Sequence, residues 1–90
     1  MRVIANFLAM NLNNEQIKVL KSIGKAETTG NVMDILGWSS NRFDEGFQFA
    51  NELQNLDLVK LLYSNFNKNL IVVELTLWGE QKGSNTGGSN

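Results

Sequence analysis

The spacing of hydrophobic and polar residues along the chain changes near residue 58. Before that point apolar residues recur at intervals of three and four positions, which is the period of an amphipathic helix. The first such stretch predicts a helix near residues 14–24, with Asn13 or Asn14 as its N-cap and Gly24 as its stop.

Two further helices are predicted from the same period. A short one is expected near residues 29–37, with Thr28 or Thr29 as its N-cap. A longer one is expected near residues 40–56, with its N-cap among residues 39–41. The apolar residues of this third helix stand at spacings of four, three and three, namely Phe43, Phe47, Ala50 and Leu53.

After the third helix, two runs rich in Leu, Val and Ile predict a β-hairpin that spans about residues 58–75. The loop between the runs, residues 64–69, contains three asparagines, a residue that favours turns. Lys60 and Glu74 are expected to lie opposite each other on the two strands. Three helices followed by a hairpin make this an α+β chain.

The two ends of the chain differ in composition. The N-terminal segment carries apolar residues at near-helical spacing, namely Val3, Ile4, Phe7, Leu8 and Leu12. They predict an extra N-terminal helix, which either packs across the two-fold axis of a homodimer or joins the core of the monomer. Residues 83–90 contain no apolar side chain and predict a disordered Gly/Ser/Asn tail. We therefore expect one folded domain over residues 1–82.

Three motifs resemble the winged helix-turn-helix superfamily, which includes small transcription regulators of the MarR and PadR type. Leu53–Val59, LQNLDLV, is similar to the end of the family's recognition helix and the entry to its wing. Leu75–Gly79, LTLWG, is similar to the Leu-Thr-x-x-Gly that closes the wing, with Thr76 as a helix N-cap. Leu36–Trp38 is similar to the turn before the third helix. The resemblance covers residues 14–80 and implies a three-helix core with a C-terminal β-hairpin wing.

The chain departs from the family pattern in two places. Asp57 stands where the family favours glycine, at a site that needs a left-handed backbone, which aspartate tolerates better than most residues. The outward positions of the third helix carry one cation, Arg42, beside several acidic or neutral polar residues, namely Asp44, Glu45, Gln48 and Glu52.

For function, the resemblance implies a transcription regulator that binds double-stranded DNA, with the third helix in the major groove. Arginine pairs with guanine, Asn or Gln with adenine, and Glu accepts from cytosine, while a lysine in the wing loop contacts phosphate. The residues implied for DNA binding are Ser40, Asn41, Arg42, Glu45, Gln48, Asn67 and Lys68. The alternative for each is an ordinary solvated helix face or polar turn.

An alternative function is a protein-interaction or dimerisation adaptor that does not bind DNA, which the acidic third helix favours. The helical spacing of most aromatic residues predicts core packing rather than a base-stacking surface. Phe49 and Phe66 fit the core stripe least well, so each is a candidate anchor for a partner protein.

The composition argues against most catalytic classes. The 90 residues contain no Cys and no His, which excludes disulfides, thiolate nucleophiles, thiolate zinc sites and imidazole bases. We expect a non-enzymatic protein without cofactor or metal. The net charge of −1 and pI of about 5.3 mean that any DNA contact depends on a local patch. Because residues 1–11 are too short and polar for a membrane span, we expect a soluble, cytoplasmic protein.

Overall fold

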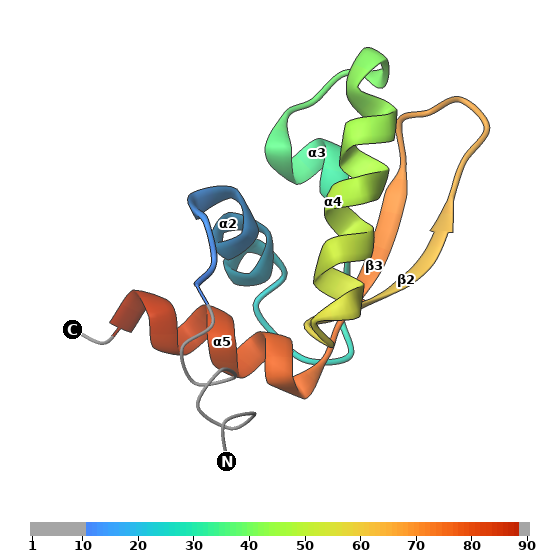
Figure 1. Ribbon diagram of the computed structural model, residues 1–90. Coiled ribbons are helices and arrows are strands. Elements are labelled where there is room, and N and C mark those ends of the chain that lie inside the picture. Colours follow the sequence, from blue (N-terminus) through green and yellow to red (C-terminus); the bar gives the residue numbers. More distant parts are fainter. Residues whose placement is uncertain (1–10, 89–90) are drawn as a thin grey trace.

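The computed structural model describes residues 11–88, so the extra N-terminal helix and dimerisation through it lie outside the described residues. The elements follow in the order α2 (Asn14–Ile23), β1 (Thr29–Asn31), α3 (Val32–Leu36), the 3₁₀ turn η1 (Ser40–Arg42), α4 (Phe43–Asn55), β2 (Val59–Ser64), β3 (Ile71–Leu75) and α5 (Leu77–Gly88). The strands form one antiparallel sheet in the order β1-β3-β2. This α+β arrangement, shown in Figure 1, is compatible with a winged-helix layout.

Helix α2 begins and ends where the sequence predicts. The Gln16 backbone N–H donates to Asn13 Oδ1 and the Asn13 N–H donates to Gln16 Oε1, both at 2.8 Å, which makes a reciprocal capping box. Gly24 ends the helix with φ of 82°, a conformation that side chains rarely adopt. Asn13 and Gly24 are therefore confirmed as the cap and the stop.

The prediction of a helix over residues 29–37 is wrong at its start. Residues 29–31 form strand β1, which pairs with β3, and helix α3 covers only Val32–Leu36. Gly30 packs between the side chains of Ile23 and Ile35, so pairing and packing outweigh the local helical period here. The N-cap is Asn31, whose Oδ1 accepts from the Met33 N–H, and not Thr28 or Thr29.

The third helix is predicted correctly in its extent but not in its first turn. Residues 40–42 form a 3₁₀ turn, and α4 begins at Phe43 with no side-chain hydrogen bond at its cap. Ser39 precedes the 3₁₀ turn and donates its hydroxyl to Asn41 Oδ1 instead of capping a backbone N–H. Gly37, in the turn before, is left-handed with φ of 70°.

The predicted hairpin is confirmed, and Lys60 is the partner of Glu74 across it. A bulge between Leu61 and Tyr63 shifts the register, and Gln54 of α4 accepts the Leu61 N–H through its Oε1 at 2.8 Å. Strand β2 is an edge of the sheet, so this side-chain bond covers part of an edge that otherwise faces water.

The core lies between the helices and one face of the sheet (Figure 1). Its buried residues come from α2, α3, α4 and the two longer strands, together with Leu58 just before β2: Val19, Leu20, Val32, Met33, Phe49, Ala50, Leu53, Leu58, Val59, Ile71, Val73 and Leu75. On β3 the buried residues alternate with half-buried ones, which is the pattern of a sheet covered on one face only.

Two motifs that carry the resemblance meet at one junction. Asp57 has φ of 64°, which confirms the left-handed backbone expected there. The Thr76 hydroxyl donates to the carbonyl of Asp57 at 2.6 Å or of Leu58 at 3.0 Å and accepts the Gly79 N–H at 2.9 Å. The junction thus ties the end of α4, the start of β2 and the N-terminus of α5 together, with Thr76 as the expected N-cap.

Helix α5 continues past residue 83, where the sequence predicts the start of a disordered tail. Gly83 is buried, and a Cβ there would lie 3.0 Å from the Cβ of Leu20 in α2. Glu80 adds a hydrogen bond from the Ala26 N–H at 2.8 Å. These contacts with α2 and the loop after it stabilise the helix as far as Gly83.

Candidate interaction surface

The seven side chains implied for DNA contact are all exposed: Ser40, Asn41, Arg42, Glu45, Gln48, Asn67 and Lys68. They come from η1, the first half of α4 and the loop between β2 and β3. The start of α4 and this loop lie at the same end of the molecule (Figure 1). We call residues 40–48 together with residues 65–69 the α4–loop surface.

Arg42 is engaged by two neighbouring side chains. Its Nε and Nη2 donate to the two carboxylate oxygens of Glu45 at 2.9 and 2.8 Å, which is a bidentate ion pair. Its guanidinium carbon also lies 3.8 Å from the ring centroid of Trp38, a cation–π distance. The one cation in η1 and α4 is therefore neutralised and stacked in this structure.

The ion pair shifts both ionisation equilibria. The hydrogen bond from Arg42 lowers the pKa of Glu45 below its ordinary value of 4.5, and the same bond raises the pKa of Arg42. Because the folded-state pKa of Glu45 is depressed, the stabilisation from the pair is present above that ordinary value. It is lost as the pH falls through the lower, folded-state pKa.

We expect the Glu45 carboxyl to titrate below 4.5 in the folded protein. The measurement is an NMR titration of its side-chain carboxyl carbon, repeated in the Arg42→Gln variant. In that variant the pKa should move back toward 4.5 while the fold is unchanged, since both side chains are exposed. A Glu45 pKa that is the same in both proteins would contradict the ion pair.

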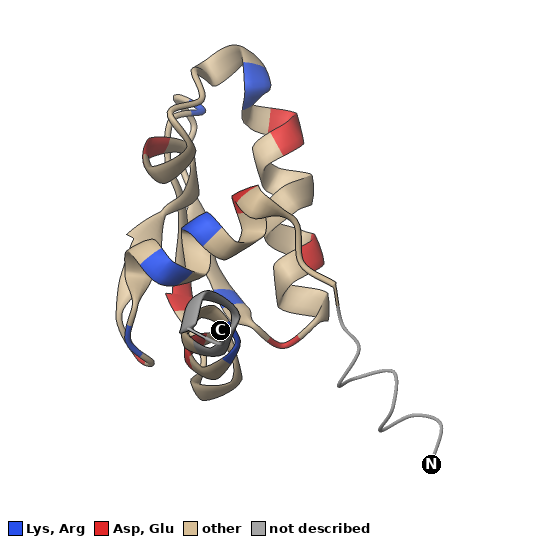
Figure 2. Cartoon of the chain, turned by 90° about the vertical axis from the view of Figure 1, so that its left-hand side faces the viewer, with Lys and Arg blue, Asp and Glu red and all other residues tan. Residues whose placement is uncertain are grey.

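The charged side chains of helix α4 are all negative. Helix α4 contains Asp44, Glu45 and Glu52 but no Lys or Arg. Lys18 and Lys21 lie on α2 instead, and Figure 2 shows the acidic bands on α4 apart from the basic bands on α2. A phosphate backbone placed against α4 would therefore meet carboxylates.

A shallow hollow opens on the first half of α4. It is open to solvent, has a volume of about 340 Å³ and is lined by Phe43, Asp44, Phe47 and Gln48. The rings of Phe43 and Phe47 stack with centroids 6.4 Å apart and an interplanar angle of 28°. Both rings are half-buried against the core, so each presents one apolar side to solvent.

The β2–β3 loop is held in one shape by Asn65. Its Oδ1 accepts the N–H groups of Asn69 at 3.0 Å and Leu70 at 2.9 Å, and its carbonyl accepts the Lys68 N–H at 3.2 Å. Lys68 has φ of 65°, which completes the tight turn. Phe66 lies on this loop with 97% of its surface exposed, as the sequence allowed.

The prediction that Phe49 is a candidate anchor for a partner protein is wrong. Only 8% of it is exposed, and it packs edge-on against Trp38 with ring centroids 6.0 Å apart. Phe49 lies beside Ala50 and Leu53 on the buried side of α4, so it belongs to the core. Trp38, Phe43, Phe47 and Trp78 pack against that core, as their spacing predicts.

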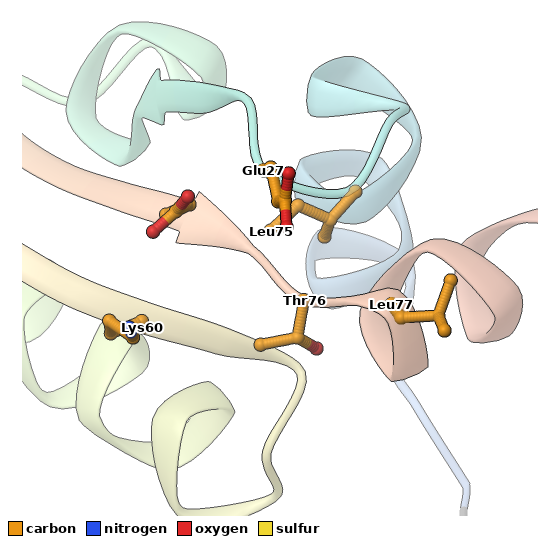
Figure 3. A pocket seen from close by; sticks show the side chains of 6 residues that line it. Glu27, Lys60, Leu75, Thr76 and Leu77 are labelled. Atoms are coloured by element: carbon orange, nitrogen blue, oxygen red, sulfur yellow. The ribbon is translucent and has the colours of Figure 1, made fainter.

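A second hollow lies beside β2, β3 and the start of α5. It encloses about 190 Å³ and is lined by Glu27, Lys60, Glu74, Leu75, Thr76 and Leu77. Figure 3 shows Glu27 from the loop after α2 above Thr76, with Lys60 from β2 to one side. The Thr76 hydroxyl already makes hydrogen bonds at the helical junction, and no aromatic residue lines this hollow. It is therefore a weaker candidate for binding a partner than the α4 hollow.

The sequence does not predict the α4 hollow, because the helical spacing of Phe43 and Phe47 predicts that both rings are buried in the core. They lie at the flank of the buried stripe of α4, at i and i+4, next to Asp44 and Gln48 with the same spacing. Their position at the edge of the stripe, beside polar residues, is the signal in the sequence that these rings are only partly buried.

Within residues 11–88, no group of three or more metal-ligating side chains comes together. The same residues contain no helix with the length and apolarity that crossing a bilayer requires. Comparison with protein families, characterised proteins and solved structures gave no match to this chain.

Proposed function

We propose that this chain is a winged-helix domain that binds protein, and not nucleic acid, through the α4–loop surface. The order of elements, the strand order and the junction built by Asp57, Thr76 and Gly79 support the winged-helix assignment. Fold alone does not set function, so the choice of partner depends on the chemistry of the surface.

The observation that carries the proposal is the charge of the helix that would enter a DNA groove. Helix α4 carries three carboxylates and no cation of its own. Arg42, just before it, is paired with one of them, Glu45, and is stacked on Trp38. DNA binding depends on cations that neutralise phosphates, which this helix lacks. Half-buried aromatic rings and an exposed phenylalanine are instead typical of protein interfaces.

DNA binding is the second candidate, and one observation favours it. Every side chain that the resemblance implies for base or phosphate contact is exposed, and the elements carrying them lie at one end of the molecule. Arg42 would have to leave Glu45 to pair with a guanine, and Lys68 would contact phosphate. This candidate makes a different prediction in the same experiment.

The test is a fluorescence-anisotropy titration of a labelled, mixed-sequence DNA duplex at about 50 mM and about 200 mM salt. Our proposal predicts no saturable binding at either concentration. Binding through phosphate contacts would instead weaken as salt rises, roughly 3.5-fold between the two concentrations for each contact. Binding of that kind, reduced by Lys68→Ala but not by Lys60→Ala on β2, would overturn the proposal in favour of the second candidate.

A further inference from the structure

Phe66 is an aromatic side chain that the described residues leave almost wholly in water. Its loop is not loose, because the side chain and carbonyl of Asn65 bind three of the N–H groups that follow. A large apolar ring on a fixed loop is arranged for contact with another molecule, since little conformational entropy is lost when it is buried. Single exposed apolar residues are common on protein surfaces, so a binding role for Phe66 also requires a complementary apolar site.

The α4 hollow supplies that receptor on the same molecule. Its stacked rings, Phe43 and Phe47, offer an apolar surface, and its volume of about 340 Å³ leaves room for an aromatic side chain. Phe66 does not fill the hollow of its own chain, because it is 97% exposed. Among residues 11–88, the apolar projection and the apolar hollow are thus not paired with each other.

Charge beside the two features is also complementary. Lys68 lies two residues after Phe66 on the loop, and Asp44 lines the hollow between Phe43 and Phe47. Neither side chain is buried, so each is free to approach an opposite charge on another molecule. Because one surface carries both complementary features, two copies can bind each other around a two-fold axis. Each contact is then made twice.

We propose that the occupant of the α4–loop surface is a second copy of this chain, with Phe66 of each copy seated in the α4 hollow of the other and Lys68 facing Asp44 across the interface. The inference rests on the proposed protein-binding function and names its partner. The start of α4 and the loop lie at the same end of the molecule, so a single contact at that end can involve both (Figure 1).

The size of the contact indicates a reversible dimer. An aromatic side chain buries roughly 150–250 Å², so two of them account for roughly 300–500 Å². Stable interfaces bury about 1,200 Å² or more, and smaller ones are transient. Exchange between monomer and dimer is therefore expected within the concentration range up to about 1 mM.

The experiment is sedimentation equilibrium of the full chain over that concentration range, with Phe66→Ser as the first variant. The wild type should show a concentration-dependent monomer–dimer equilibrium, and Phe66→Ser should raise the dissociation constant at least about tenfold. Its circular dichroism should be unchanged, because the ring makes almost no contact within the chain. A wild type that stays monomeric throughout, or a dimer unaffected by Phe66→Ser, overturns the inference.

A charge exchange tests the geometry independently. Asp44→Lys and Lys68→Asp should each weaken the dimer, and the double variant should restore it, because it re-creates the pair with opposite polarity. Lys18→Asp on α2 is the matched control and should leave the dimer unchanged. A double variant as weak as the two single variants would overturn the placement of Lys68 against Asp44.

The outcomes also separate this inference from the proposed function. A monomeric wild type that does not bind the DNA duplex removes the second copy as partner and leaves the protein-binding function in place. Salt-dependent DNA binding removes the proposed function, whatever the sedimentation result.

Discussion

Replacing Gly79 by alanine is expected to destabilise the protein by about 3 kcal/mol, the largest effect of any glycine-to-alanine change among the described residues. A Cβ at this position would lie 2.0 Å from the carbonyl oxygen of Leu58 and 2.8 Å from Leu75 Cδ1. The oxygen belongs to the backbone, so it cannot move aside without breaking the hydrogen bonds from Thr76.

The same change would be favourable in an open helix, because alanine is a better helix former than glycine by about 1 kcal/mol. Gly83→Ala is the matched control in the same helix, since its nearest contact would be the Cβ of Leu20 at 3.0 Å and not a backbone oxygen at 2.0 Å. We expect a much smaller loss there. Urea unfolding followed by circular dichroism measures both variants, and a Gly79→Ala protein as stable as the wild type would refute the packing at this junction.

Asn31→Ala is expected to cost about 2–3 kcal/mol, because one side chain makes three hydrogen bonds. Its Oδ1 accepts the N–H of Met33 at 3.2 Å, which caps α3, and the N–H of Ile71 at 2.9 Å, which lies in a fully buried residue. Its Nδ2 donates to the carbonyl of Asn69 at 3.2 Å. Truncation therefore leaves a buried donor without its acceptor and uncouples the β2–β3 loop from α3.

Asn31→Asp distinguishes these contributions. Aspartate keeps an acceptor for both N–H groups and is a good N-cap, but it loses the donor to Asn69. Urea unfolding should place this variant within about 1 kcal/mol of the wild type. Equal losses for the alanine and aspartate variants would show that the bonds to Met33 and Ile71 contribute little.

The sequence predicts most of the described fold because its signals are local. The capping box at Asn13, the stop at Gly24, the left-handed Asp57 and the N-cap at Thr76 all depend on residues within a few positions of each other. The apolar period likewise locates the body of α4 and the two strands of the hairpin.

Features that depend on distant contacts were not predictable in the same way. Strand β1 is three residues long and is defined by pairing with β3, more than forty positions later. The Asn31 bonds to residues 69 and 71 are equally remote. Helix α5 extends over residues rich in Gly and Ser, a composition that favours disorder. Its contact with α2, made at Gly83, joins residues more than sixty positions apart and is not visible in the local sequence.

Only some features of the candidate surface are likewise predictable from the sequence. The sequence identifies the acidic character of α4 and names two candidate exposed rings, of which Phe66 is exposed and Phe49 is buried. The engagement of Arg42 by Trp38 and Glu45, and the hollow beside Phe43 and Phe47, depend on side-chain conformations that a periodic pattern does not specify. These two features favour a protein partner over DNA.

The most direct test asks which partner occupies the α4–loop surface. It is a pair of NMR titrations on uniformly ¹⁵N-labelled protein, one in which the protein concentration is raised and one in which a DNA duplex is added at about 50 mM salt. The account predicts that the amides of residues 43–48 and 65–69 shift as protein concentration rises and do not shift with DNA. Shifts of those amides on addition of DNA would contradict it.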